Sequence, residues 1–260
     1  MKKPQIISIV NSKGGVSKTT SSVNIAAGLA KTGYSILLAD LDPQGNLTHS
    51  LIGDLPDGEP NITEAIRGKV SLESIVKATH INGLDIAPAG ESMVDLDLHL
   101  QSELGRETKL RGILQGKFAS KYDFILIDNS PHVSLKTINS LVSSHYFLVP
   151  VSAEYLPLVG LRHLLKIIEL VKPLNTSLRN LGFLITMVNR RESIGTDVEK
   201  ILRDTFSEDV FKNVVRVNTK LKACPQKRQT VFEAEKPSGK GYTDYLNVTK
   251  ELLKRLEKMQ

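Results

Sequence analysis

Two lysines frame a glycine pair near the start of the chain. Lys13 and Lys18 lie five residues apart, and Thr19 follows directly in the stretch "NSKGGVSKTT". Glycines let a backbone turn tightly and point its N–H groups at an anion, while a lysine supplies positive charge. A threonine hydroxyl after that lysine is a ligand for Mg²⁺. These residue types in this order predict a cradle for the phosphates of a nucleotide.

The cradle needs a strand before it and a helix after it. An apolar run at 5–10 precedes the loop, and a helical pattern begins at Lys18 and ends before Gly33. The helix adds its positive N-terminus to the site. Ser12 and Ser17 stand where the ordinary pattern G-x-x-x-x-G-K-[ST] has glycine. We expect phosphate contacts from Gly14, Gly15, Val16, Ser17, Lys18, Thr19 and Thr20.

Apolar runs and helical patterns alternate along the rest of the chain. Expected strands lie at 35–40, 84–89, 124–128, 146–151 and 181–188. Expected helices lie at 61–78, 106–120, 134–144, 158–172, 194–206 and 242–260, and a surface turn at 53–60. Strands this apolar are buried on both faces. The alternation predicts a single α/β domain over 1–260, with a mostly parallel twisted sheet flanked by helices on both faces.

Composition bounds the partners and the compartment. The net charge is +6 and the pI about 9.2, an excess that suits an anionic partner, either nucleic acid or an acidic membrane surface. Cys224 is the one cysteine, so the chain has no internal disulfide and fits a reducing cytoplasm. The most apolar long stretch, 141–161, contains Glu154 and two prolines, which disfavours a membrane span.

Polar residues gather after four of the expected strands, at 11–20, 40–46, 128–132 and 189–191. Ligands of open parallel sheets bind beyond the carboxyl ends of the strands. Each cluster alone could be a helix cap or a turn. Together they favour one shared site at that edge.

Three segments resemble a known family. The loop "KGGVSKTT" matches the deviant phosphate-loop pattern K-G-G-x-x-K-[ST], and "LADLDPQGN" and "FILIDNSP" follow at 38–46 and 124–131. With "TIN" at 137–139 and "TMVNRR" at 186–191, the chain resembles the ParA-type partition ATPases of the ParA/MinD superfamily over nearly its whole length. The resemblance implies a deviant P-loop NTPase fold, ATP and Mg²⁺ as cofactors, and ATP hydrolysis.

The resemblance also assigns roles to individual residues. It implies that Lys18 reaches the β- and γ-phosphates and that Lys13 crosses an ATP-bound dimer to the partner's phosphates; a merely local contact for Lys13 stays open. It implies that Asp42 positions the attacking water. Asp40 would support Mg²⁺ and the loop, and Asp128 would hold Mg²⁺ through water. The implied catalytic residues are Lys13, Lys18 and Asp42, and the implied metal site is Thr19, Asp40 and Asp128.

Four further positions match the family only in part or depart from its usual residue. Asn189 matches a position that reads the base edge in relatives, and Pro225 falls where relatives pack a loop on the adenine. Asn189 could equally be a turn residue. Ser17 stands where relatives usually have glycine, and Ser130 replaces the first of two prolines. Their effects on hydrolysis stay open.

A basic stretch near the C-terminus predicts a DNA surface. Residues 210–232 contain six lysines and arginines and no acidic residue. Lysines neutralise backbone phosphates without reading bases, so we expect non-specific binding to duplex DNA. A solvated basic face is the alternative. The expected contacts are Arg190, Arg191, Arg216, Lys220, Lys222, Lys227 and Arg228.

The expected function is an ATP-dependent homodimeric switch that positions or segregates DNA in the cytoplasm, on the nucleoid. A ParB-like adaptor would stimulate its slow hydrolysis. A MinD-like membrane cycle, a protein cargo and a nucleotide-dependent ligase are alternatives. Leu252, Leu256 and Met259 share one face of the last helix, interrupted by Thr249. We expect that face to pack on the core and not on a membrane.

Overall fold

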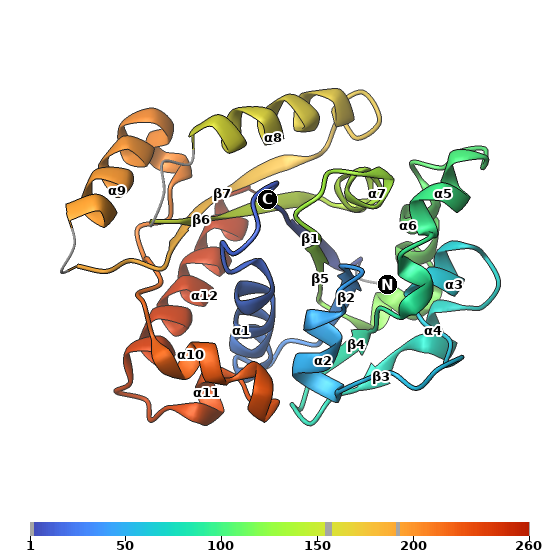
Figure 1. The fold of residues 1–260 in the computed structure, drawn as a ribbon, viewed down its shortest axis with the longest axis horizontal. Helices are drawn as coiled ribbons and strands as arrows, with labels where there is room; N and C mark the ends of the chain where they lie inside the picture. Colours follow the sequence, from blue (N-terminus) through green and yellow to red (C-terminus); the bar gives the residue numbers. More distant parts are fainter. Residues whose placement is uncertain (1–2, 154–157, 191–192, 260) are drawn as a thin grey trace.

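Seven strands form one sheet in the structure, a computed structural model that describes residues 3–153, 158–190 and 193–259. The strands are β1 Gln5–Ile9, β2 Ile36–Leu41, β3 Lys77–Ala78, β4 Leu84–Ala87, β5 Phe124–Asn129, β6 Tyr146–Ser152 and β7 Arg179–Thr186. Their order is β3-β4-β2-β5-β1-β6-β7. All neighbours pair in parallel except β3, which is antiparallel to β4 (Figure 1). The predicted mostly parallel sheet is confirmed.

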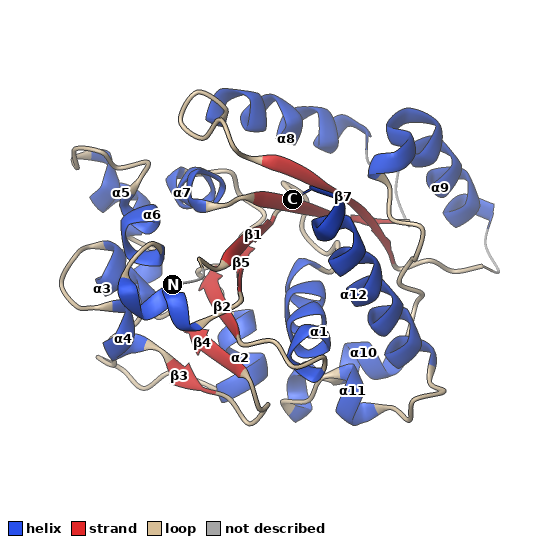
Figure 2. Ribbon diagram, turned by 180° about the vertical axis from the view of Figure 1, so that it is seen from behind, coloured by secondary structure: helices blue, strands red, loops and turns tan. Residues whose placement is uncertain are grey.

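Helices cover both faces of the sheet (Figure 2). One face carries α1 Lys18–Lys31 and α12 Lys240–Met259, with α2 Asn46–Ile52, α10 Thr219–Ala223 and α11 Val231–Ala234 in the same core. The other carries α3 Ile62–Ile66, α4 Leu72–Ile75, α5 Leu96–Gln101, α6 Lys109–Leu114, α7 Leu135–Ser143, α8 Leu158–Val171 and α9 Ser193–Phe206. Four 3₁₀ turns lie at Glu91–Met93, Lys117–Lys121, Ser207–Asp209 and Pro225–Lys227.

Alternation along each strand feeds these cores. In β2, Ile36 and Leu38 join the core under α1, whereas Leu37 and Ala39 join the core on the opposite face. All six residues of β2 are buried. This is the arrangement expected when successive side chains of a parallel strand point to opposite, helix-covered faces.

The structure differs from the sequence prediction where elements are short. The single helix expected at 61–78 is α3, α4 and the strand β3. Gly68 has φ +74 just after α3, and Ser71 then caps α4 by accepting a hydrogen bond from the Ser74 N–H. The helix expected at 106–120 is α6 followed by a 3₁₀ turn. Helices α2, α5, α10 and α11 were not predicted.

The last helix packs as expected. Leu252 and Leu256 are buried in the core shared with α1, which confirms the predicted packing. Thr249 is also buried, and it packs against Gly28 of α1, where a β-carbon would lie 2.3 Å from Thr249 Oγ1. The threonine that interrupts the apolar stripe is therefore a point of close contact between the two helices. None of the described helices combines the length and apolar character needed to cross a membrane.

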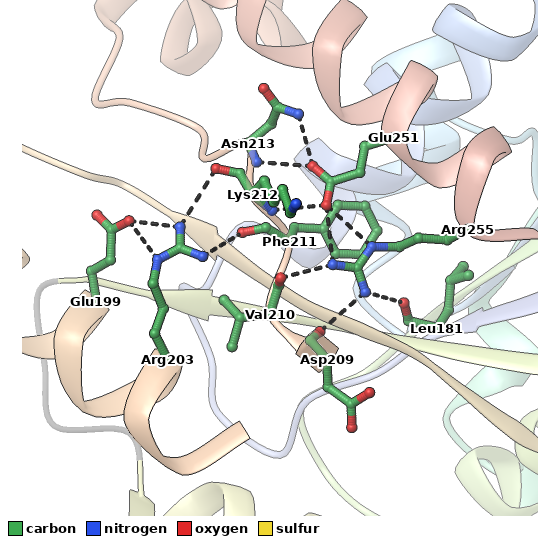
Figure 3. A network of polar contacts seen from close by, with 10 residues as sticks. All are labelled: Leu181, Glu199, Arg203, Asp209, Val210, Phe211, Lys212, Asn213, Glu251 and Arg255. Carbon is green, nitrogen blue, oxygen red and sulfur yellow. Dashed lines mark hydrogen bonds and ion pairs between the residues drawn. The ribbon is translucent and has the colours of Figure 1, made fainter. Parts of the chain in front are cut away.

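Side chains hold the segment 209–213 beside β7 (Figure 3). Between this segment and β7 the backbone forms only an isolated bridge, Phe183 with Val210, and no continuous row of strand hydrogen bonds. Arg255 donates to the carbonyls of Leu181 and Val210, and Arg203 donates to the carbonyl of Phe211. Glu251 accepts from two backbone N–H groups in this segment, those of residues 212 and 213, at 2.8 and 2.9 Å. Burial would raise the pKa of Glu251, but these donors outweigh it and lower that pKa. These contacts of Arg203, Glu251 and Arg255 hold residues 209–213 in place. The chain then continues to residues 215–229, which line the main cavity described below.

Candidate functional site

A cavity of about 520 Å³ lies at the carboxyl edge of the sheet. One wall is the loop between β1 and α1. Other lining residues come from α2 and from residues 215–229, and the latter lie far from the loop in the sequence. The loop contributes Gly14, Gly15, Ser17, Lys18, Thr19 and Thr20. Three of the four predicted polar clusters line this cavity, through the loop, through Asp42, Gln44 and Asn46, and through Pro131. No described residue of the fourth cluster, 189–191, is among the lining residues.

The glycine pair faces open space. A β-carbon built on Gly14 or Gly15 meets nothing within 4 Å, so the backbone is accessible to a ligand. Gly15 has φ +72, a conformation suited to glycine, and Val16 is buried beneath the loop. Asn11 anchors the loop by donating to the carbonyl of Pro150 at 2.7 Å. The geometry fits a phosphate cradle with its N–H groups ahead of a helix N-terminus.

The two lysines occupy different places. Lys18 is buried, and its Nζ donates to the carbonyl of Lys13 at 2.8 Å. Burial lowers the pKa of Lys18, while Asp128 and Asp42 act in the opposite direction. Lys13 lies along a second, smaller cavity of about 310 Å³ that Ser152 also lines. Among the described residues that line the main cavity, Lys18 is present and Lys13 is not.

Asp128, the next-to-last residue of β5, lies within hydrogen-bonding distance of Thr19. Its Oδ2 accepts from Thr19 Oγ1 at 2.7 Å, and its Oδ1 accepts from Ser22 Oγ at 2.7 Å. Burial, reinforced by Asp40, raises the pKa of Asp128 to about 7. A hydroxyl and a carboxylate side by side are the hard oxygen donors that Mg²⁺ prefers. The donor set fits the metal assigned to Thr19 and Asp128. Ser22 was not predicted from the sequence, although it lies one turn after Lys18 on the same helix.

Asp40 accepts hydrogen bonds from the turn that follows β2 and from α2. Its Oδ1 accepts from the Asp42 N–H at 3.1 Å, and its Oδ2 accepts from Thr48 N and Oγ1 at 2.9 and 2.7 Å. Burial raises the pKa of Asp40 to about 6. Asp40 therefore supports the site by fixing the Asp42 turn and the start of α2. Asp42 itself lines the cavity and accepts from Gln44 N at 3.0 Å.

Apolar side chains line the part of the cavity formed by residues 215–229; they include Val215, Val217, Leu221 and Pro225. The adenine contact of Pro225 stays a prediction. Asn189 is half-buried and is not among the described residues that line the cavity; its predicted role stays a prediction. Two residues that line the cavity were not predicted from the sequence: Met187, which has φ 56, and Asn218, which caps α10. An asparagine before "TKLKA" was the available signal for Asn218.

The basic residues separate into groups. Lys220, Lys222, Lys227 and Arg228 are exposed on α10 and the turn after it, and Arg190 is exposed at the end of the 181–190 segment. Arg191 lies outside the described residues.

Arg216 differs from that group, because it forms an ion pair with the buried Asp244 at 2.6 Å. The side-chain hydrogen bond with Asp244 raises the pKa of Arg216. The Arg216 backbone N–H also donates to Asp244, at 3.0 Å.

Comparison with known proteins decides the family. A family model described as "AAA domain" matches residues 4–180. The sporulation initiation inhibitor protein Soj of Bacillus subtilis (strain 168) is 36% identical over 95% of this chain and 98% of its own length. The chromosome-partitioning ATPase Soj of Thermus thermophilus is 35% identical over 98% of both chains. This chain belongs to the ParA-type partition ATPases.

A solved relative has the same fold. Cobyrinic acid a,c-diamide synthase from Mycobacterium smegmatis, with bound ATP analogue and magnesium, superposes with a TM-score of 0.86. It is 28% identical and covers 99% of this chain and 97% of its own. The deviant P-loop fold predicted from the sequence is thereby confirmed.

The family model covers only part of the chain, whereas the similar partition proteins cover nearly all of it. The family model at 4–180 contains the phosphate loop, Asp42 and Asp128, but it ends before the wall at 215–229 and the exposed cations. There the likeness rests on the two full-length partition relatives. The phosphate end of the site therefore has stronger support from the family than the base end or the basic surface.

Proposed function

We propose that this partition ATPase is an ATP-driven switch, one unit over 1–260, that dimerises with ATP, binds DNA without sequence preference and releases it on hydrolysis. The arrangement that carries the proposal is that Lys18, Thr19 and Asp42 line one cavity, while Asp128 accepts a hydrogen bond from Thr19. ATP and Mg²⁺ are the cofactors. Bound Mg²⁺ supplies charge neutralisation at the phosphates, with Thr19 and Asp128 as the residues that would hold it.

Catalysis in this proposal rests on positioning. Phosphoryl transfer needs its nucleophile in line and its developing charge stabilised. Asp42, held by the Asp40 turn, would orient the attacking water, and Lys18 would contact the terminal phosphates. Asp42 is the one carboxylate that reaches the main cavity among its described lining residues, which supports slow hydrolysis without a partner.

Lys13 gives the dimer its dependence on nucleotide. Its position along the smaller cavity, away from the main one, supports a contact with another subunit's phosphates. A lysine is a point charge on a flexible stem and suits such a reach. One from each subunit would link assembly to the triphosphate.

Gel filtration with ATP, with ADP and without nucleotide tests the switch. We expect the parent to dimerise with ATP only. Asp42→Ala should bind ATP and remain dimeric because hydrolysis stalls, whereas Lys13→Ala should bind ATP and stay monomeric. Lys18→Ala should lose ATP binding in calorimetry. Dimerisation of Lys13→Ala equal to that of the parent would refute the crossing lysine, and unchanged ATP affinity in Lys18→Ala would refute the cradle.

DNA binding would use the exposed cations around α10. Lys220, Lys222, Lys227 and Arg228 supply charge there, and we include the predicted contacts Arg190 and Arg191, of which only Arg190 lies within the described residues. Asp244 neutralises Arg216, so we assign Arg216 a smaller part. A ParB-like adaptor that accelerates hydrolysis, and action on the nucleoid in the cytoplasm, complete the proposal.

A further inference from the structure

Arg216 lines the main cavity, and Asp244 of α12 holds its guanidinium in place. Two guanidinium nitrogens, Nε and Nη2, donate to the Asp244 carboxylate at distances between 2.6 and 3.1 Å. The backbone N–H of Arg216 donates to the same carboxylate at 3.0 Å. The carboxylate is the buried partner, with a side chain 8% exposed, whereas the arginine side chain is 32% exposed. Because Nε and Nη2 lie along one edge of the guanidinium, its planar face is the part that can meet a ligand.

Asp244 is itself held firmly because α12 packs on α1. The next residue, Tyr245, is buried, and its hydroxyl lies 3.3 Å from Ser21 Oγ of α1. Helix α1 begins at Lys18, at the phosphate loop. The two packed helices therefore hold the guanidinium at a fixed place relative to the phosphate loop.

The lining of the cavity indicates which part of a nucleotide lies near Arg216. The phosphates belong at the loop, where Lys18 and the N-terminus of α1 supply positive charge. The lining residues next to Arg216 are apolar, and they include Val215, Val217 and Leu221. A guanidinium neutralised by a carboxylate attracts a phosphate weakly, but its flat face can stack on an aromatic base. This part of the cavity therefore suits the base and not the phosphates.

We propose that the Arg216 guanidinium is a stacking platform for the purine base of the bound nucleotide, and that Asp244 is the positioning residue that holds this platform. A buried ion pair contributes little net stability, because desolvation offsets the attraction, but a bidentate pair fixes the orientation of both groups. The pair therefore acts by orienting the guanidinium toward the base. The inference rests on the ATP binding of the proposed function.

Arg216→Lys tests the platform. Lysine keeps a positive charge beside Asp244 but has no planar group. Calorimetry should show a Kd for ATP that is roughly three- to tenfold higher, as expected for the loss of a cation–π or stacking contact. The hydrolysis rate at saturating ATP should stay unchanged, because Lys18, Thr19 and Asp42 are intact. A Kd equal to that of the parent, or a rate that falls as much as the affinity does, overturns the proposal.

Asp244→Asn tests the positioning role. An amide oxygen can still accept from the backbone N–H of Arg216, but it cannot hold the guanidinium with two carboxylate oxygens. We expect the Kd for ATP to rise about as much as in Arg216→Lys. In the double variant the Kd should rise no further than in Arg216→Lys, because Asp244 acts through Arg216. Effects of the two substitutions that multiply overturn the positioning role.

Glu251→Gln is the matched control. Glu251 lies on the same helix as Asp244, seven residues later, and holds the same segment through the N–H groups of residues 212 and 213, which do not line the cavity. We expect this variant to lower the free energy of unfolding in urea and to leave the Kd for ATP unchanged. An equal rise in Kd would mean that a loosened segment, and not a lost platform, weakens binding, which overturns the proposal. A parent that binds no ATP would instead refute the proposed function, whatever the variants do.

Discussion

At the scale of single residues, Ser17 is where the phosphate loop turns left-handed. Its φ is 63° and its ψ 33°, and as the cap of α1 its side chain makes no capping hydrogen bond. A residue with a β-carbon in that region is strained by roughly 1–2 kcal/mol, and glycine removes this strain. Glycine also gives the unfolded chain more conformational freedom, which offsets about 0.5–1 kcal/mol of that gain. We expect Ser17→Gly to raise the free energy of unfolding by about 0.5–1 kcal/mol in urea titrations.

Ser12→Gly is the control for that comparison. Ser12 is not among the described non-glycine residues with positive φ, and its Oγ donates to the carbonyl of Gly160 at 3.2 Å. Glycine there should lower stability, because it removes the hydrogen bond and relieves no strain. The strain argument is wrong if both substitutions destabilise.

Asp128 and Asp40 give the nucleotide-free protein a pH dependence. Burial raises the pKa of Asp128 to about 7 and that of Asp40 to about 6, whereas an aspartate in the unfolded chain has a pKa of about 4. Between those values the folded chain holds more protons than the unfolded chain, so the free energy of unfolding falls as pH rises. This contribution is complete below about pH 4 and is lost by about pH 7. Urea titrations across this range should show it.

Asp128→Asn isolates the larger part of that effect. The amide stays neutral, so the fall in stability between about pH 4 and pH 7 should become smaller than in the parent. The same variant should lose Mg²⁺-dependent ATP binding. A parent and variant with identical pH profiles would contradict the assignment.

At the scale of elements, α1 and α12 are in close contact at Gly28 and Thr249. A methyl group at Gly28 would lie 2.3 Å from Thr249 Oγ1 and 3.2 Å from its Cβ, so the Thr249 side chain or its helix would have to shift. We expect Gly28→Ala to lower the free energy of unfolding by about 1–3 kcal/mol, as overpacking does. Gly112→Ala in α6 is the control, since its β-carbon meets nothing within 4 Å and should stabilise by about 0.5–1 kcal/mol. Equal effects would contradict the close-packing explanation.

The length of an element decided whether the sequence predicted it. Every predicted strand is present, and α1, α7, α8, α9 and α12 lie within two residues of their expected bounds at each end. Buried runs and long periodic patterns carry enough residues to show their period. Helices of four to seven residues, such as α2 and α5, do not, and their positions depend on tertiary contacts such as Asp40 with Thr48.

The residues of the candidate site also divide into those that the sequence predicts and those that only the folded structure brings together. The loop residues and Asp128 were predictable, because a local motif fixes their chemistry. The wall containing Met187 and Asn218 forms only when residues 210–217 lie beside β7. Arg216 shows the limit of reading charge from sequence, since nothing near it in the chain reveals that Asp244 neutralises it.

At the scale of the whole molecule, the exposed cations around α10 predict a salt-dependent DNA contact. Each phosphate contact should contribute roughly −0.9 to the slope of log K against log salt, so a dimer using about three to four per subunit should give roughly −5 to −7. We expect ATP-dependent binding to duplex DNA of any sequence. Lys220→Glu should weaken it strongly and spare ATP binding and dimerisation.

The control for that charge reversal is Lys166→Glu. Lys166 is exposed on α8, which packs on the opposite face of the sheet from α10, and its reversal changes the net charge equally. If net charge alone attracted DNA, both variants would lose affinity to the same extent. We expect the large loss in Lys220→Glu only, measured by anisotropy at several salt concentrations. Binding that persists in Lys220→Glu, or that ignores salt and nucleotide, would leave the cations around α10 without a role in DNA binding.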